Sequence, residues 1–264
     1  MTRYLCIIIL AVCLTGCKKE KEETDAASRP AAAPATLAFK QETHQKKTTL
    51  PCTDGCTRVS ITVPLAENIP VVADSINNKI FNTVRGIVYF GEKPSNGKTY
   101  VEIMASFIGA YDKMKKDFPK DPMVPWEAKI SGEVGYKCDS IINIKLNHYM
   151  FTGGAHGYSG ERSLLFNATT GRSLKYADIF NDVKAFTAFA EKKFREKFKI
   201  PAGKNINATG LMFENDKFVL PQNIFFTKNG LLLYYNAYEV ASYAEQQKEL
   251  LLPYEQVQQY LKVK

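Results

Sequence analysis

Histidine, serine and aspartate side chains near a glycine-rich loop are the first candidates for chemistry in this sequence. His156 follows the Gly153-Gly154 pair and precedes two serines and an aspartate. A hydrolase could use such a histidine as the general base for a serine nucleophile. The segment 157–160 reads Gly-Tyr-Ser-Gly, however, and lacks the Gly-x-Ser-x-Gly elbow of serine hydrolases. We therefore expect no catalytic set, and a hydrolase that uses His156 stays the alternative. Its members would be His156, Ser159, Ser163 and Asp178.

The same loop could instead recognise a ligand. Gly153 and Gly154 allow positive backbone dihedrals and the close approach of another chain. The alternative is a tight connection between strands in which His156 bonds to the backbone. A second, tyrosine-rich segment could form an aromatic platform for sugar rings or a protein, or else pack half-buried, with Tyr234, Tyr235, Tyr238 and Tyr243. The candidate binding residues are Gly153, Gly154, His156, Tyr235 and Tyr238.

The number and spacing of the histidines do not favour a metal site. The chain has three, His44, His148 and His156, and none shows the His-x-x-x-His spacing of helical zinc sites. A zinc deacetylase would need two histidines and an aspartate around one ion. His148 lies on the apolar side of an alternating segment, which favours a hydrogen-bonded core histidine. We expect no metal and no cofactor.

The N-terminus has the pattern of a lipoprotein leader. Arg3 precedes an apolar stretch from Leu5 to Leu14, and Leu14-Thr15-Gly16-Cys17 forms a lipobox. Small residues let a peptidase approach the backbone, and the thiol of Cys17 takes the diacylglycerol. An uncleaved anchor helix is the alternative, but the apolar run is shorter than the ~20 residues of a spanning helix. The sequence thus predicts a signal peptide at 1–16 and a mature chain held on a membrane by acyl chains such as palmitate.

The residues after Cys17 indicate in which membrane the protein is anchored. Charged residues occupy 18–23, and a proline-bearing polar stretch then completes a flexible linker at 17–38. A charged patch after the lipidated cysteine resembles an export signal of Bacteroidetes lipoproteins. We therefore expect a cell-envelope protein of the outer membrane, at its periplasmic face or on the cell surface.

The net charge points to anionic neighbours. The formal charge is +8 at pH 7, and loss of Arg3 with the leader leaves +7. Export disfavours nucleic acid, so acidic glycans and lipid headgroups are the expected partners. Basic residues gather at 113–116 and 192–199, on the polar faces of predicted helices, where a solvated surface is the simpler interpretation.

Three cysteines remain after the leader and the anchor are set aside. An Asp-Gly turn separates Cys52 from Cys56, which fits a small disulfide-closed loop in an oxidising compartment. The alternative is that one of the two pairs with Cys138.

Hydrophobic patterning predicts an α+β fold. Apolar stripes predict helices over 70–90, 98–118 and 183–198, with a closing helix over 254–262. Alternating segments predict strands over 57–65, 126–136, 142–150, 160–167, 172–175, 224–227, 231–235 and 249–252. We expect an antiparallel sheet meander covered by amphipathic helices, in two intimately packed halves, 39–155 and 156–264.

Two segments carry a family resemblance. The stretch 149–157, YMFTGGAHG, continued by FNATTGRSLKYADIF at 166–180, is similar to the signature of a bacterial envelope family. That family includes the extracellular domain of the lysozyme-sensing anti-sigma factor RsiV and the accessory domain of the peptidoglycan deacetylase PdaC. The later segments YYNAYEVASYA and LLPYEQVQQYL resemble its second half. The resemblance implies a PdaC-accessory-like N-terminal half and an RsiV-like C-terminal half.

The resemblance does not extend to a known activity. We find no transmembrane helix with a cytoplasmic sigma-binding segment, and no deacetylase domain after residue 264. We therefore expect neither signalling nor deacetylation. The predicted function is that of a lipid-anchored envelope binding module for a lysozyme-like protein or a glycan such as peptidoglycan. The alternatives are the hydrolase that uses His156 and a purely structural lipoprotein.

Overall fold

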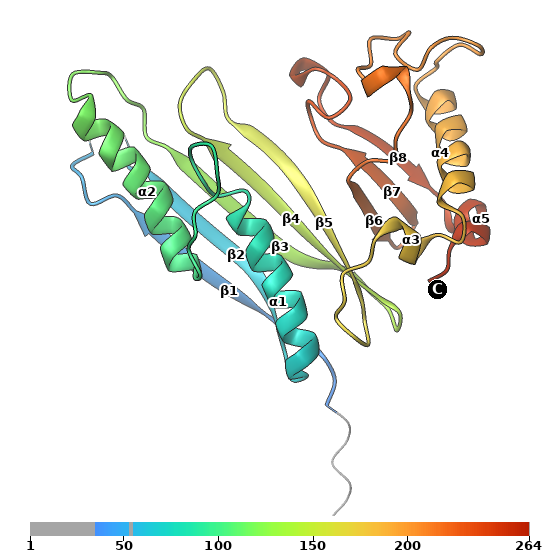
Figure 1. Ribbon diagram of the computed structural model, residues 1–264, viewed down its shortest axis with the longest axis horizontal. Helices are drawn as coiled ribbons and strands as arrows, with labels where there is room; N and C mark the ends of the chain where they lie inside the picture. The colour runs from blue at the N-terminus through green and yellow to red at the C-terminus, as the bar shows by residue number, and fades with distance from the viewer. Residues whose placement is uncertain (1–34, 53–54, 264) are drawn as a thin grey trace, which may run out of the picture. The chain divides into compact units, whose positions relative to one another are not determined.

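Two β-sheets, each covered by helices, form the folded part of the chain (Figure 1). The computed structural model describes residues 35–52 and 55–263, and the chain from Ala35 onward makes one compact unit. The predicted leader, Cys17 and nearly all of the predicted linker lie outside the described residues. Within those residues, no helix is both long and apolar enough to cross a membrane.

The first sheet has five strands in the order β1-β2-β3-β4-β5. Their bounds are β1 Ala38–Lys47, β2 Arg58–Glu67, β3 Glu127–Lys137, β4 Ile141–Phe151 and β5 Tyr158–Asn167. The α+β class is confirmed, and β3, β4 and β5 form the predicted antiparallel meander. The sheet as a whole is mixed, because β2 pairs with β3 in parallel. Two helices connect these strands, and a parallel pair needs such a crossover.

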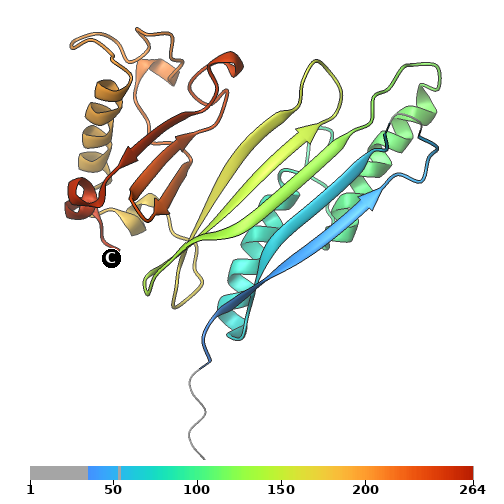
Figure 2. The same ribbon diagram turned by 180° about the vertical axis from the view of Figure 1, so that it is seen from behind.

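Helices α1 (Pro70–Arg85) and α2 (Tyr100–Asp117) cover one face of this sheet (Figures 1 and 2). Pro70 stands at the first turn of α1, where its missing N–H is harmless. The Thr99 side chain caps α2 by accepting a hydrogen bond from the Glu102 N–H. Helix α1 ends at Arg85, earlier than predicted, with Gly86 as its cap. The first core fills the space between these helices and the sheet, around Ile76, Ile80, Val84, Phe107 and Ile130.

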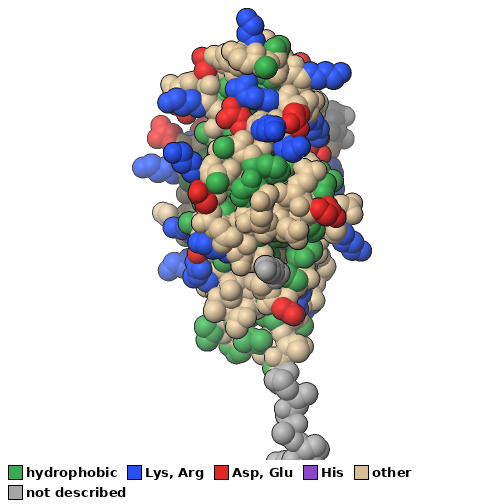
Figure 3. All heavy atoms as spheres, turned by 90° about the vertical axis from the view of Figure 1, so that its right-hand side faces the viewer, with side chains coloured by type: hydrophobic (Ala, Val, Ile, Leu, Met, Phe, Trp, Pro, Cys, Tyr) green, Lys and Arg blue, Asp and Glu red, His purple; other side chains and the backbone are tan. Residues whose placement is uncertain are grey.

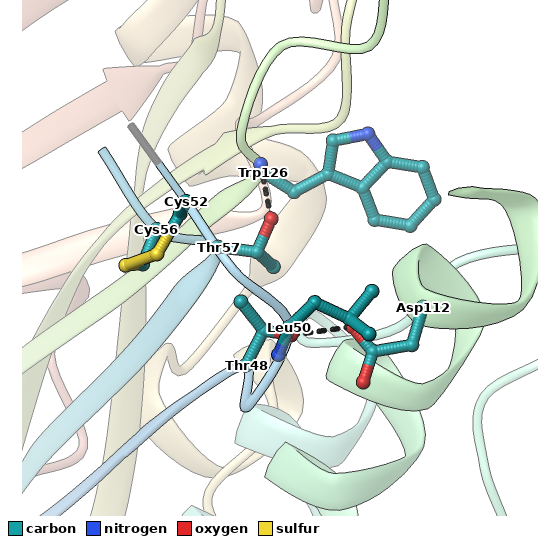
Figure 4. The surroundings of a disulfide bond; sticks show 7 residues. All are labelled: Thr48, Leu50, Cys52, Cys56, Thr57, Asp112 and Trp126. Atoms are coloured by element: carbon teal, nitrogen blue, oxygen red, sulfur yellow. Dashed lines mark hydrogen bonds between the residues drawn. A yellow bond between two sulfur atoms is a disulfide. The ribbon is translucent and has the colours of Figure 1, made fainter. Parts of the chain in front are cut away.

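A disulfide closes the connection between β1 and β2 (Figure 4). The structure joins Cys52 to Cys56 with a Cα–Cα distance of 5.4 Å and leaves Cys138 as a free thiol. Beside this loop, the Thr57 hydroxyl accepts a hydrogen bond from the Trp126 N–H at 2.9 Å. The Thr48 hydroxyl donates to the Asp112 carboxylate of α2 at 2.6 Å. The loop is thereby fastened to both layers of the first half.

The second half contains a three-stranded antiparallel sheet. Its elements are α3 Tyr176–Ile179, α4 Val183–Lys197, β6 Asn223–Thr227, β7 Gly230–Tyr235, β8 Lys248–Leu252 and α5 Tyr254–Val257, with 3-10 turns at Glu214–Asp216, Tyr243–Glu245 and Gln258–Tyr260. The predicted strand at 172–175 is reduced to a bridge at Ser173, and the closing helix shortens to one α-turn and a 3-10 turn. Aromatic rings dominate the second core, among them Phe186, Phe194 and Tyr235.

Strands β4 and β5 supply side chains to both cores. Ile142 and Ile144 lie in the first core, whereas Ile141 lies in the second, because successive residues of a strand point to opposite faces. Strand β5 also belongs to the first sheet although it follows residue 155. The division into 39–155 and 156–264 stays a prediction.

Buried asparagines join the two halves. The Asn143 amide oxygen of β4 accepts from the Phe226 N–H of β6 at 2.9 Å, and its amide nitrogen donates to the Ser163 hydroxyl at 2.9 Å. On the outer edge of β5, the Asn236 side chain accepts from the Glu161 N–H at 2.7 Å and donates to the Glu161 carbonyl at 3.1 Å. Asn236 thus pairs with the edge strand as another strand would.

The charge on the second half is mixed rather than uniform. On the side of the molecule seen in Figure 3, basic and acidic side chains are interspersed. On α4, Arg195 lies 2.8 Å from Glu191 and Lys193 lies 3.1 Å from Glu196. These exposed helical pairs offset part of the positive charge that the sequence concentrates at 192–199.

Candidate functional site

The glycine-rich loop connects β4 to β5 and has an unusual backbone. Gly153 and Gly154 have φ values of +101° and +89°, a region that other residues rarely adopt. A Cβ atom at either position would meet no heavy atom within 4 Å, so the need for glycine is conformational. At Gly157 the need is steric instead, because an added Cβ would lie 2.4 Å from the ring of Tyr149.

A row of stacked aromatic rings ties this loop to the segment 236–247. The exposed ring of His156 stacks on Tyr243 with a centroid distance of 4.0 Å and an interplanar angle of 11°. Tyr243 stacks on Tyr238 at 5.5 Å, and Tyr238 stacks on Tyr158 at 6.4 Å. We call His156, Tyr243, Tyr238 and Tyr158 the aromatic row. The β4–β5 connection, the start of β5 and the segment 236–247 therefore form one surface feature.

The two tyrosines that the sequence singled out have different fates. Tyr238 is 57% exposed and belongs to the aromatic row. Tyr235 is fully buried, and its hydroxyl donates to the Val219 carbonyl at 2.6 Å, so its prediction as a surface binding residue is wrong. Residues 231, 233 and 235 share the core face of β7, and burial raises the pKa of the Tyr235 phenol.

The residues of the alternative hydrolase are engaged separately. Asp178 forms two hydrogen bonds with Arg172, at 3.1 and 2.9 Å, and this contact lowers the pKa of its carboxyl to about 2. The Ser163 hydroxyl donates to the Ile224 carbonyl at 2.6 Å. His156 Nδ1 lies 2.9 Å from the neighbouring Gly157 carbonyl. The structure therefore does not assemble these side chains into a relay.

His148 is buried, yet it is not the fully hydrogen-bonded core residue that the sequence suggested. Its side chain lies against Gly160 of β5, and Nδ1 has no hydrogen-bond partner. Burial, assisted by the nearby charge of Arg162, lowers the pKa of the imidazole to about 4. The ring is therefore neutral at physiological pH.

Beside the aromatic row lies a cleft of about 470 Å³ on the sheet face opposite α1 and α2. Its floor comes from β3, β4 and β5, and its wall from Tyr234 and the segment 237–247. The lining is mainly polar, and most of its side chains can both donate and accept hydrogen bonds. It includes Lys129, Ser131, Asn147, His148, Tyr149, Ser159, Glu161, Tyr243, Gln246 and Gln247.

Sequence reasoning missed the floor of this cleft. Its side chains occupy the polar positions of alternating strands, for example Asn147 and Tyr149 on either side of His148. That pattern is also typical of an ordinary solvent-facing sheet surface. The only available signal was the proximity of Tyr149 to the glycine-rich loop in the chain.

The charges of the cleft are partly neutralised. Glu161 lies 2.7 Å from the Lys145 ammonium, which also lies 5.5 Å from the centroid of the Phe225 ring. Lys129 has no ion-pair partner within the described part of the chain. In residues 35–52 and 55–263, no group of three or more His, Cys, Asp or Glu side chains is arranged to hold a metal ion.

Comparison with known families accounts for most of this architecture. Residues 51–159 match the family model described as Deacetylase PdaC, and residues 177–255 match the model described as a protein of unknown function, DUF3298. The chain thus resembles PdaC in its first half and DUF3298 proteins in its second. The segment that matches PdaC holds β2, β3, β4 and the glycine-rich loop, with His156 and Tyr158 of the aromatic row. The segment that matches DUF3298 holds the second sheet and the other two members of the row, Tyr238 and Tyr243.

Solved structures of DUF3298 proteins share the fold. A DUF3298 family member from Bacteroides fragilis is 20% identical, with a TM-score of 0.65 over 86% of this chain and 94% of that one. A DUF3298 family protein from Pseudomonas aeruginosa is 19% identical, with a TM-score of 0.61 over 87% of this chain and 96% of that one. No curated protein gives a significant match. At these identities the similarity establishes the fold of this chain and nothing about its ligand.

Proposed function

We propose that this protein is a lipid-anchored binding protein of the cell envelope, which holds a glycan such as peptidoglycan or a wall-active protein of the lysozyme type. The lipobox at Cys17 supports an acyl anchor, with the folded part outside the cytoplasm. The charged residues after Cys17 favour the outer membrane, at its periplasmic face or on the cell surface.

The aromatic row is the observation that carries this proposal. Exposed aromatic rings offer large apolar faces at small entropic cost, and such residues dominate many binding interfaces. Here Tyr238 is 57% exposed, and its ring stacks on the rings of Tyr243 and Tyr158. The backbone of Tyr238 has a φ of +69°, a strained value that persists only where surrounding contacts impose it. An exposed ring that is held in place by neighbouring rings is typical of a residue that contacts a ligand, and we interpret Tyr238 in this way.

Retention on two immobilised probes tests the binding role. The purified full-length protein in detergent is passed over insoluble peptidoglycan sacculi and over immobilised lysozyme. We expect retention on at least one of them, and Tyr238→Ala should weaken that retention at least about tenfold. Phe118→Ala is the matched control, because Phe118 is an aromatic residue of the helical layer that is 53% exposed. Retention on neither probe, or equal losses in both variants, would overturn the proposal.

The anchor needs its own experiment. Mass spectrometry of the native protein should find a chain that begins at an acylated Cys17, and Cys17→Ser should move the protein from the membrane fraction to the soluble fraction. An intact, unmodified leader in the native product would refute the assigned location.

A further inference from the structure

The cleft on the open face of the first sheet offers more specific chemistry than the aromatic row beside it. Its volume of about 470 Å³ lies within the range of ~300 to 1,000 Å³ typical of small-ligand sites. The amides of Asn147, Gln246 and Gln247 can each donate and accept, as can the hydroxyls of the lining serines and tyrosines. Such a lining matches a ligand that carries many hydroxyl and amide groups of its own.

A buried oxygen of the cleft has no partner. Glu161 lies opposite Asn147 of the cleft floor, and its Oε2 makes no hydrogen bond within the described part of the chain, although Oε1 contacts Lys145. Buried polar groups in native proteins are nearly always paired. This oxygen therefore points to a hydrogen bond completed from outside the chain, by a donor of a ligand or by water that the ligand displaces.

A second hollow extends the cleft along the sheet. It has a volume of about 640 Å³ and lies over β1, β2 and β3. Lys129 lines both hollows, so they meet at its side chain and form one trough. The second hollow adds Lys47 and Arg58 on this face against a single acid, Glu127, which lies 3.0 Å from Arg58. The trough is therefore elongated and carries an excess of positive charge, with Lys129 unpaired at its centre.

We infer that this trough binds a linear oligosaccharide that carries carboxylate groups. Sugar hydroxyls and acetamido groups match the amide and hydroxyl lining, and a carboxylate would take a charge-assisted hydrogen bond from Lys129. The cations along the floor give the trough a positive electrostatic potential, which favours an anionic chain over a neutral one. This inference rests on the proposed binding function and names the ligand class for it. Both lactyl-substituted wall glycans and uronic-acid polymers have the required chemistry.

Calorimetry with two matched pairs of tetrasaccharides tests the inference on the full-length protein in detergent. The first pair is a tetramer of alternating N-acetylglucosamine and N-acetylmuramic acid, and the N-acetylglucosamine tetramer, which lacks the lactyl carboxylate. The second pair is tetragalacturonate and its methyl ester. We expect at least one acid to bind at least about tenfold more tightly than its neutral counterpart. The pair that responds identifies the source of the carboxylate.

Two lysine variants then locate the site. Lys129→Met should remove the preference for the acid while the neutral sugar binds as before. Lys79→Met makes the same charge change on α1, at an exposed position of the opposite layer, and should leave the preference intact. If all four sugars fail to bind, if acid and neutral forms bind equally, or if both variants behave alike, the inference is wrong. Retention on sacculi or lysozyme in the same preparation would show that the proposed function survives that failure.

Discussion

Asn143 should be among the most costly polar residues to replace in this protein. Its side chain is 1% exposed and lies between the two sheets. The amide oxygen accepts from the Phe226 N–H at 2.9 Å, and the amide nitrogen donates to the Ser163 hydroxyl at 2.9 Å. Leucine keeps the branching and the number of heavy atoms of asparagine, so Asn143→Leu opens no cavity and the loss is mainly one of hydrogen bonds.

The magnitude follows from these contacts. Two net hydrogen bonds contribute about 0.5 to 1.5 kcal/mol each. The Phe226 N–H would also stay buried without an acceptor, which adds about 1 to 3 kcal/mol if no water replaces the amide. The hydrophobic gain of leucine offsets part of this sum. We expect the free energy of unfolding to fall by about 2 to 4 kcal/mol, which for a fold of this length lowers the melting temperature by roughly 5 to 15 °C.

Urea unfolding followed by fluorescence provides the measurement. Trp126 is the single tryptophan of the chain and is buried in the first core, while Asn143 contacts the second sheet. The fluorescence of Trp126 therefore reports the unfolding of the first half, to which β4 and Asn143 belong. Asn147→Leu is the matched control, because it makes the same change on the same face of β4, where the side chain lines the open cleft. A loss below about 0.5 kcal/mol for Asn143→Leu, or equal losses in both variants, would refute the reasoning.

Three further predictions concern the glycine-rich loop, the disulfide and the buried histidine. Gly154→Ala should lower the free energy of unfolding by about 1 kcal/mol in urea, because φ is +89° at this position. Gly109→Ala, at an exposed position inside α2, should instead raise it by about 0.5 to 1 kcal/mol. The opposite order of the two changes would contradict the argument. Reduction of the disulfide between Cys52 and Cys56 should lower the free energy of unfolding by about 2 kcal/mol, since the closed loop is short, and an unchanged urea midpoint in dithiothreitol would count against it. The pKa of His148 is lower in the folded state, about 4, than its usual value of 6.5, so protonation favours the unfolded chain; stability should decline as pH falls from 6.5 toward 4, and His148→Gln should flatten that decline in urea midpoints measured across the range.

The elements that the sequence predicted well are those whose pattern is local. The spacing of Val72, Ile76, Ile80 and Val84 places them on one stripe of a helix, and these residues lie in the first core. The Lys228-Asn229-Gly230 turn between two apolar runs corresponds to the hairpin of β6 and β7. Each of these signals depends on neighbours a few residues apart, which the sequence displays directly.

The features that the sequence did not predict depend on partners far along the chain. Strand β1 has mostly polar, exposed residues because it is an edge strand, so its alternation is weak. The parallel pairing of β2 with β3 follows from a crossover of two helices, which has no local signature. Tyr235 and Tyr238 look equivalent in the sequence, but Tyr235 ends on the core face of β7, whereas Tyr238 lies in the turn after that strand and is exposed.

The edge of β5 links the fold of the second half to the candidate site. Asn236 bonds to both backbone groups of Glu161, and its own N–H donates to the Glu239 carboxylate at 2.9 Å. The chain then passes directly into Ala237 and Tyr238, which begin the wall of the cleft and the aromatic row. No other strand can pair with β5 at this point, because the side chain of Asn236 already occupies its donor and acceptor. Asn236 therefore closes the sheet edge and holds the start of the 237–247 segment beside β5. The geometry of the cleft thus depends on the same contacts that hold the two halves together.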